Sequence, residues 1–264
     1  MMKKMKLKYW LLLFLIFFSA CGRSEAEPAS VNELEDSQTS YTELEDLQTP
    51  YTETEELQTP YIILPPPELD GDMSVEMALA NRRSQRDFQD KALSIEQLSQ
   101  ILWAAYGITS PMPDRPRGGL RTTPSAGAQF PLEIYVIVGN VDGIEAGVYR
   151  YISEEHKIVQ IMSGDVRSEL SEAALGQRMV QEAPASVIYS AVFERTTAMY
   201  GDRGIAYVYM EIGHSAQNVY LQAVALGLGT CAIGAFIDDR VSQILNLLDD
   251  EEPLYLMPVG YYYD

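Results

Sequence analysis

A ten-residue acidic repeat near the N-terminus limits where this chain can form a packed domain. Three degenerate copies occupy residues 31–40, 41–50 and 51–60, and residues 25–56 hold 11 acidic side chains and no lysine or arginine. A segment this polar and this uniformly charged buries too little apolar surface to offset the entropy of ordering it. We therefore expect residues 22–61 to be a disordered, solvated tether, or alternatively an acidic arm for a partner, and residues 62–264 to form one folded domain.

The first 21 residues have the pattern of an export signal. Four lysines lie within residues 1–8, an apolar run follows at 9–18, and Ser19-Ala20-Cys21 comes next. This run is shorter than the roughly 20 residues that a membrane-spanning helix needs. Residues 18–21 resemble a bacterial lipobox, which implies a signal peptide at 1–21, a lipidated Cys21 and an extracytoplasmic, membrane-anchored lipoprotein. An uncleaved N-terminal anchor is the alternative.

Charge and cysteine content exclude several classes of function. The formal net charge of −19 argues against a nucleic-acid partner, because such proteins need clustered cations. Two cysteines and two histidines are too few for the usual four-ligand Cys/His zinc site, and no metal site is expected. With Cys21 lipidated, Cys231 has no disulfide partner within the chain.

Hydrophobic periodicity predicts an α+β domain. We expect helices at 73–81, from the capping-box pattern Ser94–Gln97 to Gly107, and at 166–175, 205–226 and 238–248. Strands are expected at 132–138, 147–151, 158–162, 184–193 and 254–259. These elements do not alternate strictly, which favours α+β over a doubly wound sheet. The segment 205–226 is apolar with few charges and predicts a long, buried central helix.

An arginine-rich segment follows the first expected helix. Arg82, Arg83, Ser84 and Arg86 lie within five residues, although residues 62–264 carry 27 acidic and only 14 basic side chains. Arginine guanidinium groups and a serine hydroxyl can donate hydrogen bonds to phosphate oxygens, so the segment could form an anion-binding cradle. A solvated basic patch paired with the neighbouring aspartates is equally compatible with the composition.

A segment of small residues precedes the strand expected at 132–138. Small side chains let the backbone approach a planar ligand closely, and glycine allows dihedrals that other residues avoid. A nucleophilic Ser125 is not favoured, because the Gly-x-Ser-x-Gly elbow is absent and neither histidine has an obvious pairing. The candidate residues of this segment are Pro124, Ser125, Ala126, Gly127 and Ala128.

A second small-residue segment follows the longest expected helix. Gly227-x-Gly229-x-x-Ala232 formally matches a dinucleotide-binding fingerprint, but that fingerprint must follow a strand and open a helix. We therefore expect a turn that packs against a flat ligand or a helix end, with Cys231 as a small buried hydrophobe. The candidate residues here are Ala232, Ile233, Gly234 and Ala235.

Together, the three segments resemble the flavin-dependent nitroreductase superfamily over residues 73–260. Residues 82–88 are similar to its first motif, which holds the FMN phosphate and ribityl chain. Residues 124–128 are similar to its second motif, beside the flavin ring, and residues 232–236 to its third, which contacts the ring through the backbone. The resemblance implies a homodimeric α+β fold with a central mixed β-sheet surrounded by helices, and FMN at the subunit interface.

Further residues resemble the SagB-type, or thiazole/oxazole-forming, dehydrogenase branch. They are the segment 124–128, the stretch 200–204 and the pattern Glu211-x-Gly213-His214-x-x-Gln217-Asn218. The resemblance implies hydride transfer through FMN, acting on a small-molecule or peptide substrate. Azoline-oxidising members carry a Lys-Tyr pair where this chain has Met199-Tyr200, which leaves Tyr200 as the catalytic candidate. The alternative is a flavin-fold binding or scaffold module without efficient turnover.

Three polar features are expected to have structural roles only. His214 is expected in the core or at an interface, and His156 in a solvent-exposed turn. The acidic run 249–252 lacks the ligand spacing of a calcium loop, so we expect a solvated turn.

Overall fold

The computed structural model describes residues 60–263 of the chain. The predicted signal peptide, Cys21 and almost all of the predicted tether lie outside the described residues. Within residues 60–263, no helix combines the length and the apolar character needed to cross a membrane.

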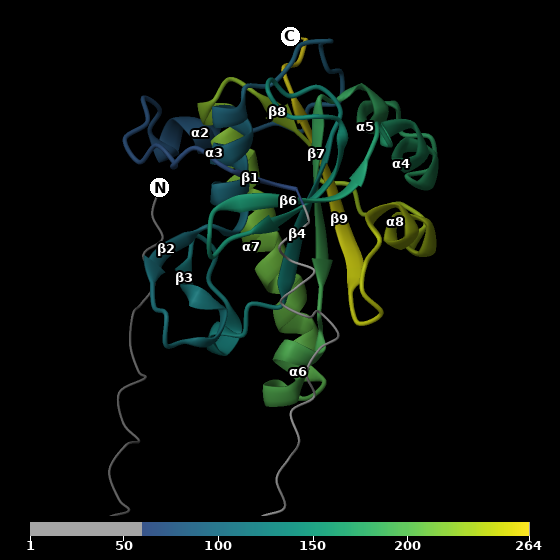
Figure 1. Ribbon diagram of the computed structural model, residues 1–264. Helices are drawn as coiled ribbons and strands as arrows, with labels where there is room; N and C mark the ends of the chain where they lie inside the picture. Colours follow the sequence, from purple (N-terminus) through teal and green to yellow (C-terminus); the bar gives the residue numbers. More distant parts are fainter. Residues whose placement is uncertain (1–59, 264) are drawn as a thin grey trace, which may run out of the picture. The chain divides into compact units, whose positions relative to one another are not determined.

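A seven-stranded sheet forms the centre of the domain (Figure 1). Its strand order is β1-β6-β5-β4-β7-β9-β8, and β2 pairs with β3 in a separate two-stranded sheet. The strands are β1 (Tyr61–Ile63), β2 (Ile108–Pro111), β3 (Gly119–Arg121), β4 (Leu132–Val138), β5 (Gly147–Ile152), β6 (Lys157–Ser163), β7 (Ala185–Ala191), β8 (Gly229–Thr230) and β9 (Glu252–Gly260).

The expected mixed sheet is instead antiparallel at every pairing between the named strands. Short connections join β4 to β5 and β5 to β6, as antiparallel neighbours allow. The centre of the sheet is fully buried: Val136 on β4 lies opposite Val187 on β7 and Tyr149 on β5. The remainder of the α+β prediction is confirmed.

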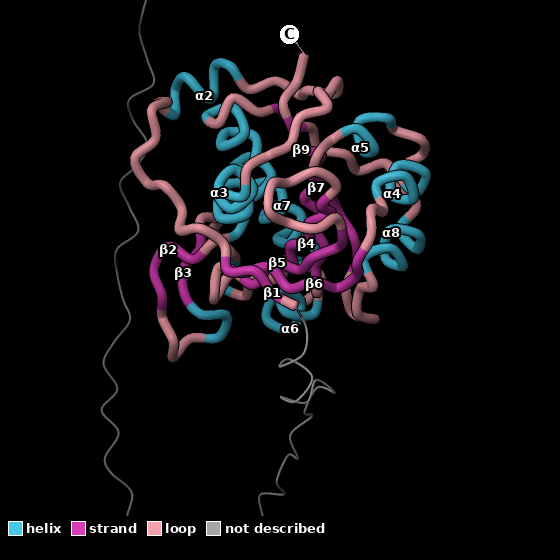
Figure 2. Tube along the Cα trace, turned by 45° about the horizontal axis from the view of Figure 1, so that its top comes forward, coloured by secondary structure: helices cyan, strands magenta, loops and turns pink. Residues whose placement is uncertain are grey.

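Helices cover both faces of the sheet (Figure 2). Alternate residues of β4 face opposite layers, because side chains on a strand point to opposite sides. Ile134 and Val136 belong to the core with α3 and α7, whereas Tyr135 and Ile137 belong to the core with α4, α5 and α8. The helices are α2 (Val75–Asn81), α3 (Ile95–Tyr106), α4 (Arg167–Ala173), α5 (Arg178–Glu182), α6 (Glu194–Tyr200), α7 (Arg203–Ala225) and α8 (Asp238–Leu245).

Helix α3 has the ends that its sequence predicts. The Ser94 hydroxyl accepts from the Gln97 N–H at 3.2 Å, and the Gln97 side chain accepts from the Ser94 N–H at 3.0 Å. These two bonds form the capping box. Gly107 is the C-terminal cap, and a side chain there would collide with the Trp103 ring.

Helix α7 is the predicted long central helix, and it is buried along the face that packs on the sheet, whereas its outer face is exposed within one chain. Val208 and Ile212 point into the core, whereas the side chains of Ile205, Tyr209 and Met210 are 43%, 54% and 50% exposed. The helix is apolar on both faces, but the single chain covers only the face against the sheet. His214 is exposed on this helix, which rules out the core position within one chain.

Two polar side chains are more buried than expected. His156 is half-buried and lies within hydrogen-bond distance of Ser99 (2.8 Å), Tyr151 (2.8 Å) and the Pro65 carbonyl (2.9 Å). Glu251, in the acidic run, is buried because its carboxylate accepts from the hydroxyls of Tyr135 at 3.0 Å and Ser190 at 2.6 Å. Such partners offset the cost of burying polar groups, and the sequence pattern does not reveal them.

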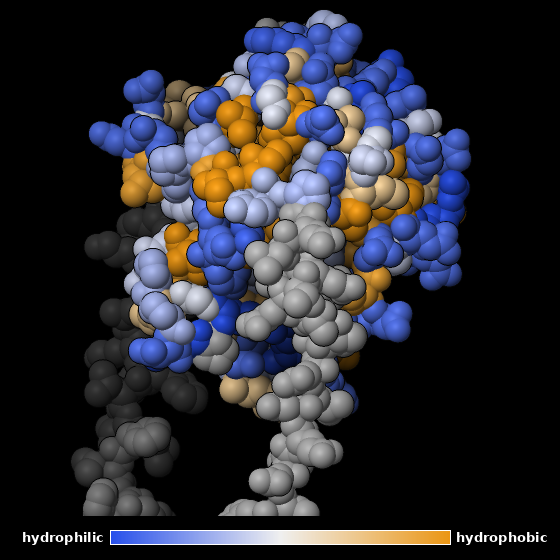
Figure 3. All heavy atoms as spheres, in the orientation of Figure 1, coloured by the Kyte–Doolittle hydropathy of each residue, from blue (hydrophilic) through white to orange (hydrophobic). Residues whose placement is uncertain are grey.

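On the face shown in Figure 3 hydrophilic side chains predominate, and a group of apolar side chains lies over the region of β1 and α3. Strand β1 is an edge strand, and its Tyr61 and Ile63 side chains are each 59% exposed.

Candidate functional site

The first and third predicted segments meet at Tyr220, near the C-terminal end of α7. The Ala232 N–H donates to the Tyr220 hydroxyl at 2.8 Å, and the Ser84 hydroxyl lies 3.0 Å from the same oxygen. The Arg82 guanidinium lies over the Tyr220 ring, 5.1 Å from its centroid. Residues more than 130 positions apart in the chain therefore share one tyrosine, which the sequence patterns did not single out.

Backbone contacts hold these two segments side by side. Ser84 forms an isolated parallel bridge with Thr230, and the Gln85 N–H donates to the Thr230 carbonyl at 3.0 Å. Cys231 is fully buried, as expected, and burial raises the pKa of its thiol to about 11, against the opposing charge of Arg86. A thiol with so high a pKa is a packing residue rather than a nucleophile.

The arginine cradle, defined here as Arg82, Ser84 and Arg86, has the donor set for an anionic group. Within residues 60–263, neither Arg82 nor Arg86 forms a salt bridge. Asp87, the aspartate expected to neutralise a solvated patch, pairs with Arg178 at 2.7 Å instead. Two cations and a hydroxyl without a carboxylate partner fit a phosphate.

Arg83 is turned away from the other residues of its segment. Its guanidinium donates to the carbonyl oxygens of Ala80 at 3.0 Å and Arg82 at 2.8 Å, at the end of α2. The structure therefore brings Arg82 and Ser84 to Tyr220 and leaves Arg83 on the exposed side of the turn.

The segment 124–128 forms a short 3₁₀ turn with unusual backbone dihedrals. Gly127, Ala128 and Phe130 all have positive φ, at 59°, 55° and 46°. Left-handed φ is uncommon for residues with a Cβ, and such strain concentrates at functional sites. The Phe130 N–H donates to the Ser125 hydroxyl at 2.8 Å, which fixes the turn.

Tyr200 lies directly against this turn, at the end of α6. A Cβ on Gly127 would stand 2.7 Å from the Tyr200 hydroxyl and 2.9 Å from the Met199 sulfur. Glycine is therefore required at 127 both for its positive φ and for this close approach. The structure thus places the catalytic candidate beside the second predicted segment.

Segment 122–128 runs alongside α7. The Asn218 side chain, two residues before Tyr220, donates to the Thr122 carbonyl and lies within hydrogen-bond distance of the Thr123 hydroxyl, both at 3.2 Å. Ser125 hydrogen-bonds to Glu211 farther along the helix, and Gly127 lies against Tyr200, which precedes the helix. Helix α7 therefore links the second predicted segment to the region of Tyr220 and the arginine cradle.

The third segment exposes backbone while anchoring one side chain. Ile233 is buried and exchanges two backbone hydrogen bonds with Leu256 on β9, at 2.9 and 3.0 Å. Gly234 and Ala235 follow and are exposed. The Ala235 carbonyl accepts from the Gln177 side chain at 3.0 Å, so the exposed stretch after the contact of Ala232 with Tyr220 is held on both sides.

Glu211 is a buried carboxyl beneath the segment 124–128. It is 2% exposed, and it accepts a short hydrogen bond of 2.5 Å from the Tyr106 hydroxyl. Burial raises the pKa of Glu211 to about 7, although hydrogen bonds from Ser125 and Tyr106 and the charge of Arg121 oppose the shift. Glu211 thus connects α7 to the turn through Ser125.

Replacing Glu211 with glutamine should remove a pH-dependent loss of stability. The folded pKa of about 7 lies above the unfolded value of 4.5, so the stabilising effect of the bound proton is complete below pH 4.5 and is lost as the pH rises through 7. As the pH rises from about 5.5 to about 8.5, the free energy of unfolding of Glu211→Gln should increase by about 2 kcal/mol relative to that of the native chain. Urea unfolding of the variant and native full-length chains at both pH values measures this increase. A difference in free energy of unfolding between the two proteins that does not change with pH would contradict it.

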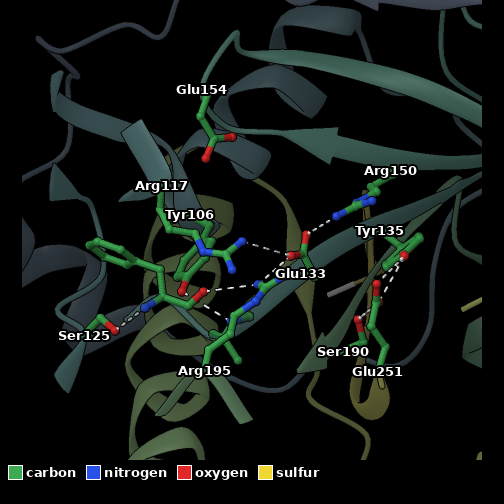
Figure 4. A network of polar contacts seen from close by, with 12 residues as sticks. Tyr106, Arg117, Ser125, Glu133, Tyr135, Arg150, Glu154, Ser190, Arg195 and Glu251 are labelled. Atoms are coloured by element: carbon green, nitrogen blue, oxygen red, sulfur yellow. Dashed lines mark hydrogen bonds and ion pairs between the residues drawn. The ribbon is translucent and has the colours of Figure 1, made fainter. Parts of the chain in front are cut away.

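A network of arginines surrounds Glu133, away from the arginine cradle (Figure 4). Its carboxylate lies 2.6 Å from Arg195, 2.9 Å from Arg150 and 4.0 Å from Arg117. Burial would raise the pKa of Glu133, but Arg150 and Arg195 hold it below its ordinary value. No sequence pattern indicated this network, because its members are far apart in the chain.

Comparisons with known proteins agree on one family. The model of the nitroreductase family matches residues 79–261. A protein of Methanocaldococcus jannaschii, named as a candidate nitroreductase, is 50% identical over 189 residues, which cover 72% of this chain and 91% of the relative. The trifolitoxin-processing protein TfxB of Rhizobium leguminosarum bv. trifolii is 32% identical over 133 residues, which cover 48% of this chain and only 35% of TfxB.

Solved structures show the same fold. The structure of a candidate nitroreductase from Ralstonia eutropha has a TM-score of 0.65 and 30% identity, covering 77% of this chain and 90% of that one. A second, from Anabaena variabilis, has a TM-score of 0.66 and 28% identity, covering 78% of this chain. This chain spans 42% of the Anabaena protein, less than half its length.

Proposed function

The chain belongs to the nitroreductase family, and on that premise we propose that it is an oxidoreductase that works through FMN. The observation that supports this most strongly is the arginine cradle: Arg82 and the Ser84 hydroxyl lie beside Tyr220, and neither Arg82 nor Arg86 forms a salt bridge within residues 60–263. When bound, FMN would supply the group that accepts and donates hydride.

We assign the three segments distinct roles toward this cofactor. Arg82, Ser84 and Arg86 would bind its phosphate, because arginine forks and hydroxyls match phosphate oxygens. The turn 124–128 and the exposed backbone at 232–235 would lie along the flavin ring. The strained dihedrals at Gly127 and Ala128 and the exposure of Gly234 and Ala235 favour these roles.

A homodimer would cover the exposed apolar face of α7. The outer face of that helix exposes Ile205, Tyr209 and Met210. Contiguous exposed apolar side chains are typical of subunit interfaces. Sedimentation of the FMN-loaded full chain should give the mass of two chains; a monomer with bound FMN would contradict the dimer.

We further propose the SagB-type branch, with a small-molecule or peptide redox substrate. The segments 124–128 and 200–204 support this assignment, and the second places Tyr200 against Gly127. The similarity to TfxB, a protein named for processing trifolitoxin, supports the same branch.

Turnover tests the proposed function. The full chain should oxidise NADH or NADPH with a quinone or nitroaromatic acceptor when FMN is supplied, and should be inactive without FMN. Hydride transfer to such acceptors requires only positioning, which the rigid turns provide. A chain that binds FMN yet shows no turnover with any of these pairs would favour the scaffold module instead.

We also propose that the chain is a lipoprotein, anchored outside the cytoplasm through Cys21. The basic, apolar and small-residue order of residues 1–21 supports export and processing.

Cys21→Ala should abolish lipid labelling and release the protein from the membrane fraction, because the thiol is the proposed attachment point. Radiolabelled fatty acid and intact mass of the membrane fraction measure both effects. The matched control is Cys231→Ala, which should remain labelled. Equal labelling of Cys21→Ala would refute the anchor.

A further inference from the structure

A small charged cavity lies behind the segment 124–128, apart from the arginine cradle. Its volume is about 80 Å³, and it is enclosed by residues from β3, β4, β5 and the start of α6. Its charged lining residues are Arg117, Arg121, Arg150, Arg195, Glu133 and Glu154.

The cavity has an excess of positive charge. Four arginines face two glutamates, although residues 62–264 as a whole are acidic. Glu133 is shared among three of these arginines, and Glu154, whose side chain is 41% exposed, pairs only with Arg121. The four arginines that line the cavity therefore carry two formal positive charges more than its two glutamates.

Two arginines that line the cavity carry a buried donor atom that has no partner among residues 60–263. They are the Nε atoms of Arg121 and Arg150. The Arg121 side chain is only 4% exposed, and its terminal nitrogens are already used by the carbonyls of Tyr106 and Arg117 and by Glu154. Buried polar atoms nearly always have a hydrogen-bond partner, so these donors point to a missing acceptor.

The size and chemistry of the cavity define that acceptor. A water needs about 10–15 Å³ of such space, so 80 Å³ holds a group of several atoms. Arginine forks bind planar or tetrahedral oxyanions bidentately. A carboxylate or a phosphate group fits both conditions.

A neighbouring cavity connects this site to the predicted flavin contact. It measures about 280 Å³ and shares Arg117, Phe130 and Arg195 with the smaller cavity, while Gly127 and Ala128 line its other side. A molecule bound at the arginines could therefore extend to the turn against which Tyr200 packs.

We propose that the cavity at Arg117, Arg121, Arg150 and Arg195 binds a carboxylate or phosphate group. Resting on the proposed function, we assign that group to the redox substrate, whose reactive part would lie toward Gly127. The site would select anionic substrates by charge, because an uncharged analogue leaves the excess positive charge of the cavity uncompensated.

Titration calorimetry with inorganic phosphate and with acetate, at constant ionic strength in chloride, tests the site. The titrations use full-length Arg82→Ala protein, so that phosphate binding at the arginine cradle is weakened. Adding Arg117→Gln should weaken binding of the preferred anion at least tenfold, because Arg117 has only a distant carboxylate partner at 4.0 Å. The matched control, Arg240→Gln, removes an exposed arginine paired with Glu172 and should change nothing.

Glu133→Gln should strengthen anion binding, whereas Arg117→Gln weakens it. It frees Arg150 and Arg195 from their carboxylate and should tighten anion binding at least threefold.

The preference between acetate and phosphate identifies the substrate group. Lack of binding in the Arg82→Ala protein, or equal binding with Arg117→Gln, would show that the cavity holds water only. Absence of FMN binding by the native chain, with anion binding in the Arg82→Ala protein intact, would instead overturn the proposed function and leave this site standing.

Discussion

Met199→Lys should increase thiazole formation from a thiazoline peptide by 10²–10⁴-fold, the usual contribution of a positioned general base. The native FMN-loaded chain is accordingly expected to be a poor azoline oxidase while still turning over NAD(P)H. The measurement is the initial rate of thiazole formation by mass spectrometry, with native and variant chains at equal flavin content.

The structure explains why this position matters. Oxidising an azoline ring removes a proton from carbon, and a methionine thioether does not accept protons. The Met199 sulfur lies beside Gly127, so a lysine there would place an amine next to the proposed flavin contact and to Tyr200. Reduction of a quinone needs no such base.

A methionine far from the site provides the control. Met162 on β6 is 38% exposed, so Met162→Lys should leave the rate unchanged. Fast thiazole formation by the native chain, undiminished in Tyr200→Phe, would show that the base lies elsewhere.

Arg82→Ala should weaken FMN binding at least tenfold. A hydrogen bond to a charged group contributes about 1.5–3 kcal/mol, which corresponds to roughly 10–150-fold in affinity. In the part of the chain that the structure describes, Arg82 forms no salt bridge, and its one ring contact is with Tyr220. Flavin fluorescence titration of the full chain measures the change.

The control for this variant is Arg240→Ala, on α8, which removes an exposed arginine of the same size. It should bind FMN as the native chain does. If Arg82→Ala binds FMN with the affinity of the native chain, the arginine cradle is not part of the cofactor site.

The sequence predicted those elements that have strong local signals. The capping box at Ser94 and the β-branched run of β4 appear at the predicted positions. Short elements such as α6 and β8 were not predicted, because seven or two residues carry too little periodicity. The outer face of α7 was misjudged because hydropathy shows that a surface is apolar but not what covers it.

The sequence predicted the segments of the candidate site one by one, but not how their side chains come together in space. The clustering of Arg82, Ser84 and the small residues was visible locally, but Tyr220 and Glu211 act through contacts made only after folding. The arginines around Glu133 were hidden for the same reason: Arg117 and Arg195 are 78 positions apart and meet across β4. Single isolated arginines give no local signal of a shared cavity.

The FMN content of the purified protein tests the proposed function most directly. The full chain is incubated with FMN, separated from free flavin by gel filtration, and its visible absorption is compared with its protein concentration. We expect close to one FMN per chain, with absorption bands that bleach when NADH or NADPH is added without oxygen. A folded, colourless protein after gel filtration would contradict the proposal that this chain works through FMN.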